Sequence, residues 1–345
     1  MSASRLLSLD VFRGLTIAGM ILVNNPGSWS HVYAPLRHAP WHGWTPTDMV
    51  FPFFLWISGL AMTLSFARRQ STGAGRPRLL LHAARRAATI FALGLLLNLI
   101  PQFDFSTVRI PGVLQRIGVC YFFTSLIYLY LPHRGQFLAA LGLLLTYTAT
   151  MLYLPFPGAT PDRWSIEANA ARFLDGILLE GHMWRATRVW DPEGALSTLP
   201  AIATMLCGVL ARDYFHSGLL LAALGLLLDF VIPINKPLWT PSYVLLMAGL
   251  ASLLHAALHE WIDVRQHRAY TRFFTIYGSN AIVSFVFSGA IARILGQSGY
   301  GKTIFITLNA WFSPVNASLV YALANVAVCF MVVWLLHRKQ ILVRL

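Results

Sequence analysis

The chain has 345 residues, of which 57% are hydrophobic and 11% are charged, and its formal net charge is +13. About a quarter of the residues in a soluble globular protein are charged, so this composition excludes a soluble protein and indicates an integral membrane protein. The positive charge does not indicate a nucleic-acid partner, because the basic residues lie mostly in short connections between apolar segments.

A helix that spans a bilayer needs about 20 mainly apolar residues, and ten segments of the sequence meet this condition. We predict an all-α polytopic membrane protein with about ten transmembrane helices in one bundle, forming a single domain over residues 1–345. The first segment lacks a small-residue cleavage site and carries two charges, so a retained helix is expected rather than a signal peptide. The predicted spans are residues 6–25, 48–67, 79–100, 111–131, 136–154, 195–212, 217–233, 240–260, 273–295 and 316–337.

The distribution of Lys and Arg predicts the orientation of the chain in the membrane. With the N-terminus in the cytoplasm, most of these residues fall in cytoplasmic connections, as the positive-inside rule requires. Both termini are therefore expected to be cytoplasmic. The two longest connections, about residues 24–47 and 155–194, then face the extracytoplasmic side. Long connections over a rigid scaffold are where binding and catalytic residues concentrate.

The first predicted helix carries polar residues at both ends. Asp10 and Arg13 stand three residues apart on one helix face and can pair, while Arg13 could instead bind an anionic ligand such as a phosphate. At the other end, Asn24 either caps the helix or donates a hydrogen bond to a developing oxyanion.

The connection that follows, LRHAPWHGWTPTDMVFP (36–52), concentrates titratable groups. His38 suits a general base near neutral pH, and Asp48 can orient its ring or simply favour the first turn of the next helix. His42 follows His38 by four residues, but Pro40 between them argues against a helix that would bring both to one metal ion. No metal site is expected.

Three later segments are expected at the same face as this connection. They are RIPGVLQR (109–116), WDPEGALST (190–198) and INKPLWTPSY (234–243). Two interpretations stay open. Each segment is simply an interfacial anchor, or the three converge with the His38 connection on one site.

Taken together, these motifs resemble the heparan-α-glucosaminide N-acetyltransferase family, which includes a lysosomal membrane enzyme and bacterial relatives. The resemblance implies transfer of acetyl from cytoplasmic acetyl-CoA to the amine of glucosamine, or of a glucosamine-terminated saccharide, on the extracytoplasmic side. It also implies an active-site histidine at His38, with Asn24 and Asp48 lining the same site. The segments that carry it are residues 5–27, 38–59, 109–122, 190–202, 234–244 and 277–285.

The roles expected from this resemblance follow acyl-transfer chemistry. His38 would take the amine proton, Asp48 would orient its ring, and Asn24 would donate to the oxyanion, while an acetyl-histidine intermediate remains open. The residues expected to contact acetyl-CoA are Arg13, Arg85, Arg86 and Arg116, and those expected to contact the sugar are Trp41, His42, Trp44, Asp191 and Glu193.

The sequence departs from the lysosomal relatives in two ways. His42 occupies a position that usually reads Asn in them, and their extra N-terminal luminal region is absent, so a small amino sugar is the expected acceptor. A bacterial inner membrane, with the lipid bilayer as surroundings and a possible homodimer, is the expected setting. The alternative function is an amino-sugar transporter or permease that binds sugar without acyl transfer.

Overall fold

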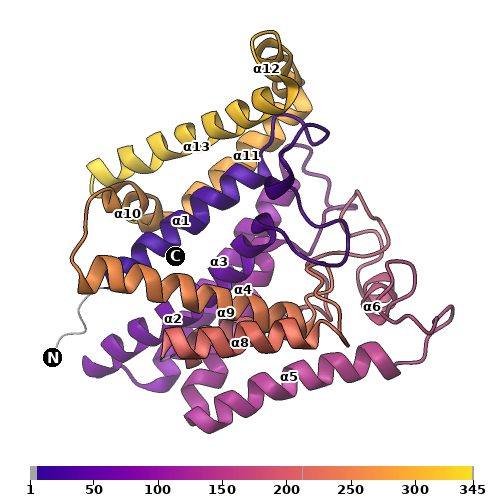
Figure 1. The fold of residues 1–345 in the computed structure, drawn as a ribbon, viewed down its shortest axis with the longest axis vertical. Helices are drawn as coiled ribbons and strands as arrows, with labels where there is room; N and C mark the ends of the chain where they lie inside the picture. Colours follow the sequence, from indigo (N-terminus) through magenta and orange to yellow (C-terminus); the bar gives the residue numbers. More distant parts are fainter. Residues whose placement is uncertain (1–5, 212, 344–345) are drawn as a thin grey trace.

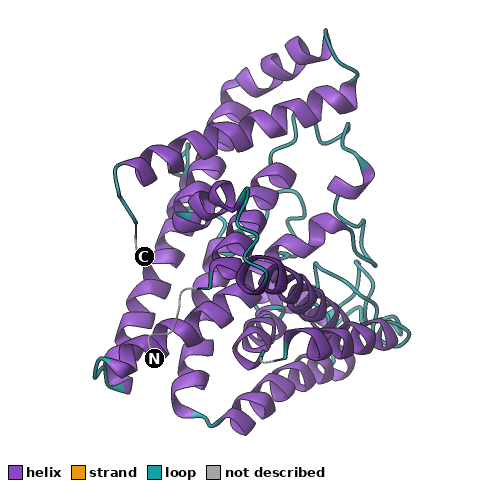
Figure 2. Cartoon of the chain, turned by 60° about the vertical axis from the view of Figure 1, so that its left-hand side comes forward, coloured by secondary structure: helices purple, strands orange, loops and turns teal. Residues whose placement is uncertain are grey.

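The computed structural model describes residues 6–211 and 213–343, which fold into thirteen α-helices and no β-strand (Figures 1 and 2). A short 3-10 helix (Ala34–Leu36) and a π-helix (His259–Val264) accompany them. The α-helices are α1 (Leu7–Asn24), α2 (Pro46–Ser71), α3 (Arg76–Leu99), α4 (Val113–Tyr130), α5 (His133–Tyr153), α6 (Ala170–Leu178), α7 (Thr198–Leu210), α8 (Tyr214–Leu228), α9 (Pro241–Leu258), α10 (Thr271–Ser279), α11 (Ala281–Ser298), α12 (Tyr300–Asn309) and α13 (Pro314–Arg338).

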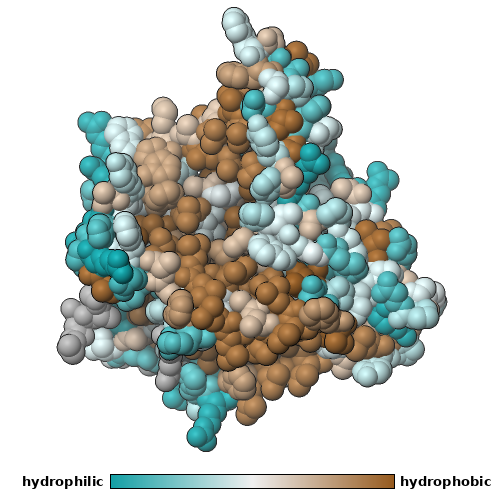
Figure 3. Space-filling view, in the orientation of Figure 1, coloured by the Kyte–Doolittle hydropathy of each residue, from teal (hydrophilic) through white to brown (hydrophobic). Residues whose placement is uncertain are grey.

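Eight of these helices are long and apolar enough to cross a membrane, which confirms the predicted all-α polytopic class. Figure 3 shows apolar side chains across the middle of one face, with hydrophilic side chains gathered at both ends. The predicted spans 195–212 and 217–233 are shorter than expected, since α7 has 13 residues and α8 has 15. The first of these two predicted spans ends at residue 212, which lies outside the described residues.

The prediction of one continuous helix over residues 273–295 is wrong, because the chain breaks at Asn280 between α10 and α11. The Asn280 side chain donates to the Ile341 carbonyl oxygen (3.1 Å) and accepts from the Val343 amide (2.9 Å). Just before the break, α10 approaches α1 so closely that a Cβ on Gly278 would lie 2.5 Å from the Asp10 carbonyl oxygen. Tertiary contacts therefore set this boundary, and apolar composition did not reveal it.

Glycines also allow α2 and α7 to cross with their backbones in contact. A Cβ on Gly59 would lie 2.0 Å from the Met205 carbonyl oxygen, and one on Gly208 would lie 2.0 Å from the Trp56 carbonyl oxygen. Small residues at helix crossings permit such approach in membrane proteins. The crossing packs α2, whose first turn carries Asp48, firmly against α7.

Connections from distant parts of the sequence meet at one end of the bundle, at the right of Figure 1. The connection after α1 is hydrogen-bonded to that before α9, since the Gly43 amide donates to the Ile234 carbonyl oxygen (2.7 Å). It also contacts the segment between α5 and α7, where Trp41 Nε1 donates to the Trp164 carbonyl oxygen (2.8 Å). The candidate site lies among these connections.

Candidate active site

The site is built around the carboxylate of Asp48, whose side chain is 1% exposed. Its Oδ1 lies 2.6 Å from His38 Nδ1 and 3.2 Å from Lys236 Nζ, and both nitrogens contact it as hydrogen-bond or ion-pair partners. Its Oδ2 receives the backbone amides of Ala39 and Thr45, each at 3.0 Å, and the Thr45 hydroxyl at 3.1 Å. Five donors thus fix one buried carboxylate at the N-terminus of α2, where the helix dipole also favours negative charge.

His38 is held by one ring nitrogen and presents the other. Because an ionised carboxylate only accepts, the short contact with Asp48 favours a proton on Nδ1, and Nε2 is then the ring nitrogen that faces away from the carboxylate. Nε2 forms no hydrogen bond with any described residue, and the side chain is 40% exposed. A ring in this state can accept a proton from a group that approaches Nε2.

Lys236 joins this pair from the connection between α8 and α9. Its Nζ lies 2.9 Å from His38 Nδ1, although the two residues are 198 positions apart in the sequence. Burial lowers the pKa of Lys236 from its ordinary value, and the charge of Asp48 partly offsets this effect. The sequence placed Lys236 only in the INKPLWTPSY segment, where an interfacial anchor explained it equally well.

His42 lies at the junction between the two connections rather than beside Asp48. Its Nδ1 is 3.4 Å from the Asn235 side-chain amide, next to the hydrogen bond from the Gly43 amide to the Ile234 carbonyl. Its ring meets the edge of Trp41. These contacts suit a residue that docks one connection on the other.

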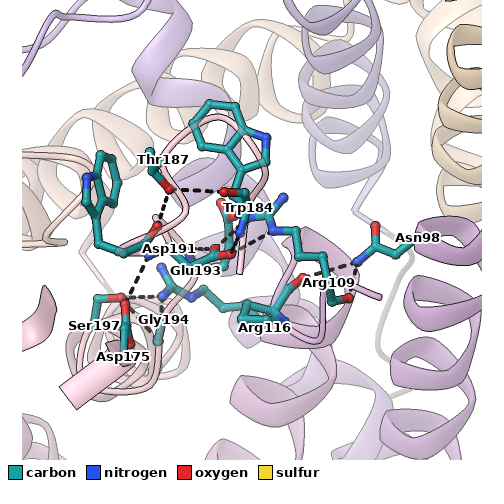
Figure 4. Close-up of polar contacts among 12 residues, drawn as sticks. Asn98, Arg109, Arg116, Asp175, Trp184, Thr187, Asp191, Glu193, Gly194 and Ser197 are labelled. Carbon is teal, nitrogen blue, oxygen red and sulfur yellow. Dashed lines mark hydrogen bonds and ion pairs between the residues drawn. The ribbon is translucent and has the colours of Figure 1, made fainter. Parts of the chain in front are cut away.

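A second polar cluster joins the segment before α4 to the segment before α7 (Figure 4). Arg109 donates to both carboxylate oxygens of Asp191, from Nε at 2.8 Å and from Nη2 at 2.5 Å, and also contacts Glu193. Asp191 further accepts from the Trp184 amide (2.9 Å). Although burial alone would lower the pKa of Arg109, the charges of Glu193 and Asp191 raise it above its usual range.

Asp191 is therefore engaged in holding two connections together, and its side chain is 0% exposed. The sequence-based expectation that it binds sugar stays a prediction, and the geometry favours a structural role for it. Glu193 is 10% exposed and keeps more freedom to contact a ligand.

Replacing Asp191 by Ala is expected to lower the free energy of unfolding by about 1–3 kcal/mol, because it leaves the half-buried Arg109 with only Glu193 and removes the acceptor of the Trp184 and Glu193 amides. Thermal unfolding in detergent measures the effect. Glu180→Ala is the control, since Glu180 is exposed and forms no hydrogen bond or ion pair with a described residue, so no change in Tm is expected. Equal losses in the two variants would contradict a structural role for the Arg109–Asp191 pair.

Arg116 lies in the first turn of α4, 2% exposed. Its Nη2 donates to the Gly194 carbonyl oxygen (3.0 Å) and to the Ser197 hydroxyl (Figure 4). Its guanidinium lies 5.1 Å from the Trp239 ring centre. Its Nε and Nη1 are buried without a hydrogen-bond partner among the described residues. These two donors are compatible with the expected contact to the acetyl donor, which stays a prediction.

Asp175 of α6 stabilises the turn before α7, the one that contains Gly194. It accepts from the amides of Asp191 (3.1 Å) and Ala195 (3.0 Å), and a Cβ on Gly194 would lie 2.1 Å from its Oδ2. Burial raises the pKa of Asp175 to about 6, although the two amides act in the opposite direction.

This shift predicts a pH dependence of stability. Between the ordinary value of 3.8 and about 6, the unfolded chain has lost the Asp175 proton while the folded chain keeps it. The free energy of unfolding therefore falls as pH rises through this window and levels off above it. Asp175→Asn does not titrate, so the Tm difference between wild type and variant is expected to change from pH 4 to 6 and stay constant above. A constant difference over the whole range would refute the assignment.

The remaining expected residues lie in different surroundings. Asn24 ends α1 with an exposed side chain that forms no hydrogen bond to a described residue. Its neighbour Asn25 is buried and donates to the Ile21 carbonyl oxygen (2.6 Å) and the Ser288 hydroxyl (2.9 Å). Trp41 meets the edge of Trp190. Trp44 directly precedes Thr45, a donor to Asp48, and its side chain is 38% exposed.

The three cationic residues expected near the cytoplasm are not gathered in one contact. Arg13 lies 3.4 Å from Asp10, which forms the predicted ion pair. Arg86 stacks over Tyr121, with 4.7 Å from its guanidinium carbon to the ring centre. Arg85 is exposed on α3. Their role in binding acetyl-CoA stays a prediction.

Comparison with known proteins supports the family resemblance. A family model described as "Heparan-alpha-glucosaminide N-acetyltransferase, catalytic" matches residues 5–161, which include His38, Asp48, Arg109 and Arg116. The heparan-alpha-glucosaminide N-acetyltransferase of Mus musculus is 28% identical over 83% of this chain and 53% of its own length. That of Homo sapiens is 28% identical over 82% of this chain and 52% of its own length. The chain thus spans about half the length of these curated relatives.

Proposed function

Because this chain is related to the heparan-α-glucosaminide N-acetyltransferase family, we propose that it is a membrane-embedded N-acetyltransferase. Its donor is acetyl-CoA, and its acceptor is the amine of glucosamine or of a glucosamine-terminated saccharide. The His38–Asp48 pair carries this proposal, because the carboxylate holds Nδ1 of the ring and leaves Nε2 open to a reactant.

Acetyl transfer to an amine requires a base, since an amine attacks a thioester only through its lone pair. The amine nitrogen forms a bond to the acetyl carbon, and His38 Nε2 takes the proton that the nitrogen loses. The carbon–sulfur bond then breaks, and the thiol of the donor leaves with that proton. Asp48 holds the ring in place and stabilises the imidazolium that forms between the two proton transfers.

The negative charge that develops on the acetyl oxygen needs a hydrogen-bond donor. Asn24 at the end of α1 carries a side-chain amide that no described residue occupies, so it is free to serve in this role. Arg116, with two unused donors, is the candidate for a contact with the thioester end of the donor.

The acceptor would bind among the connections at the same end of the bundle. Trp41, His42 and Trp44 follow His38 closely in the sequence, and aromatic faces commonly pack against sugar rings as apolar surface. Glu193, which also contacts Arg109, is proposed to accept a hydrogen bond from the sugar.

We place this end of the bundle on the extracytoplasmic side and the termini in the cytoplasm, on the basis of the Lys and Arg distribution. The family resemblance is the basis for proposing a bacterial inner membrane. The acetyl group would then cross most of the bilayer on a donor held from the cytoplasmic side. Arg13, Arg85 and Arg86 are the cationic residues proposed for its phosphates.

The test uses purified protein in sealed vesicles with glucosamine enclosed and acetyl-labelled acetyl-CoA added outside. Protein in the matching orientation should form labelled N-acetylglucosamine inside the vesicles, and vesicles without protein should form none. Uptake of labelled sugar into vesicles free of acetyl-CoA, with no acetyl transfer, would instead establish a transporter and reject the proposed enzyme.

A further inference from the structure

One cation of the site has no part in the mechanism above. Lys236 places its ammonium 3.2 Å from Asp48 Oδ1, the same oxygen that His38 Nδ1 approaches at 2.6 Å. The two nitrogens lie 2.9 Å from each other. One carboxylate oxygen therefore serves two basic side chains, which cannot both be charged there without strong mutual repulsion.

The surrounding groups set the charge of this cluster. Asp48 faces His38 and Lys236 from α2, and Glu193 acts on Lys236 across the site. From α9, the Tyr243 hydroxyl donates to the Asp48 backbone carbonyl (2.6 Å) and adds no charge. The charges of Asp48 and Glu193 favour the ammonium form of Lys236, whereas its burial acts against that form.

The backbone holds Lys236 in this position. The preceding residue, Asn235, is fully buried, and its side chain accepts from the Leu238 amide (2.8 Å). Trp239 has a φ of 56°, which closes a tight turn after Lys236. Because the Gly43 amide also binds this connection, the ammonium is fixed relative to the His38 segment.

Resting on the proposed function, we propose that Lys236 is a positioning residue that keeps His38 in its neutral, proton-accepting form by balancing the charge of Asp48. A carboxylate alone beside an imidazole favours the imidazolium, and an imidazolium cannot act as a base. An ammonium on the same oxygen removes this preference, while the carboxylate still orients the ring. The informative substitution of Lys236 therefore removes the ammonium charge but retains an unbranched side chain of similar length.

The first experiment compares the pH dependence of kcat/KM for acetyl transfer in wild type, Lys236→Met and Lys236→Arg. In Lys236→Met the acid limb is expected to move to higher pH, with about a tenfold loss at pH 6 and little loss above pH 8. Lys236→Arg keeps the positive charge and should restore the wild-type profile. Lys302→Met is the matched control, since Lys302 is an exposed lysine on α12.

The second experiment does not require acetyl transfer. Diethyl pyrocarbonate modifies the neutral imidazole, and trypsin cleavage after Arg37 and Arg68 releases one peptide that contains both His38 and His42. At pH 6, His38 of Lys236→Met should react about tenfold more slowly than His38 of wild type. His42 in the same peptide is the internal control, and its rate should not change.

The outcomes separate the two proposals. If wild type transfers no acetyl but His38 reactivity falls in Lys236→Met, the enzyme proposal fails and the role of Lys236 stands. A uniform loss of kcat/KM at every pH, with unchanged His38 reactivity, would overturn the role of Lys236. An unchanged profile in folded Lys236→Met, judged by size-exclusion behaviour and Tm, would overturn it as well.

Discussion

Purified His38→Ala is expected to transfer acetyl from acetyl-CoA to glucosamine with a kcat about 10²- to 10⁴-fold below that of wild type. The loss follows from geometry, because His38 offers the ring nitrogen that is open beside the buried Asp48 carboxylate. The KM for glucosamine should change little, since the base acts on the proton rather than on the sugar ring. Steady-state formation of N-acetylglucosamine measures both quantities.

His42→Ala is the matched control for this result. His42 contacts Asn235 at the junction of two connections and does not reach Asp48, so its removal is expected to lower kcat only a few-fold. A His38→Ala enzyme that keeps more than a tenth of the wild-type kcat would remove His38 from the mechanism. A complete loss in His42→Ala alone would transfer the role to that residue.

Gly59→Ala is expected to be strongly destabilising, with a loss of about 1–3 kcal/mol or more in the free energy of unfolding. The added Cβ would lie 2.0 Å from the Met205 carbonyl oxygen, which belongs to the backbone of α7 and has no side chain that can move aside. Gly208→Ala meets the Trp56 carbonyl oxygen at the same distance. Either change must push α2 and α7 apart.

Gly142→Ala provides the contrast in the same measurement. Gly142 lies inside α5, and a Cβ there meets nothing within 4 Å. Alanine favours a helix over glycine by up to about 1 kcal/mol, so Tm should stay constant or rise. Thermal unfolding of both variants in one detergent decides the matter, and a Gly59→Ala protein as stable as Gly142→Ala would refute the tight crossing.

The sequence predicts the long helices well because their signal is local. An apolar run of about 20 residues forms a helix in a membrane wherever its backbone must satisfy its own hydrogen bonds. The break at Asn280 is different, because it depends on contacts with Ile341 and Val343, about sixty residues further along the chain. Hydropathy carries no trace of such contacts.

The candidate site divides in the same way. His38 and Asp48 lie ten residues apart in one polar connection, so the sequence alone suggested that they interact. Lys236 completes the group from 198 positions away, and Arg109 meets Asp191 across 82 positions. A lysine or an aspartate in an interfacial segment can have several structural roles, such as anchoring the segment at the membrane surface. Only the folded chain shows which partner it has.

The distance in sequence between His38 and Lys236 also bears on biosynthesis. When α1 and α2 have entered the membrane, His38 is already present to contact the Asp48 carboxylate, but Lys236 has not yet been translated. The complete group forms only after α8 has been inserted and the connection that leads to α9 has docked on Gly43. A nascent or truncated chain therefore holds the histidine without the lysine. If the proposed roles of both residues hold, activity is expected only after the connection before α9 has docked.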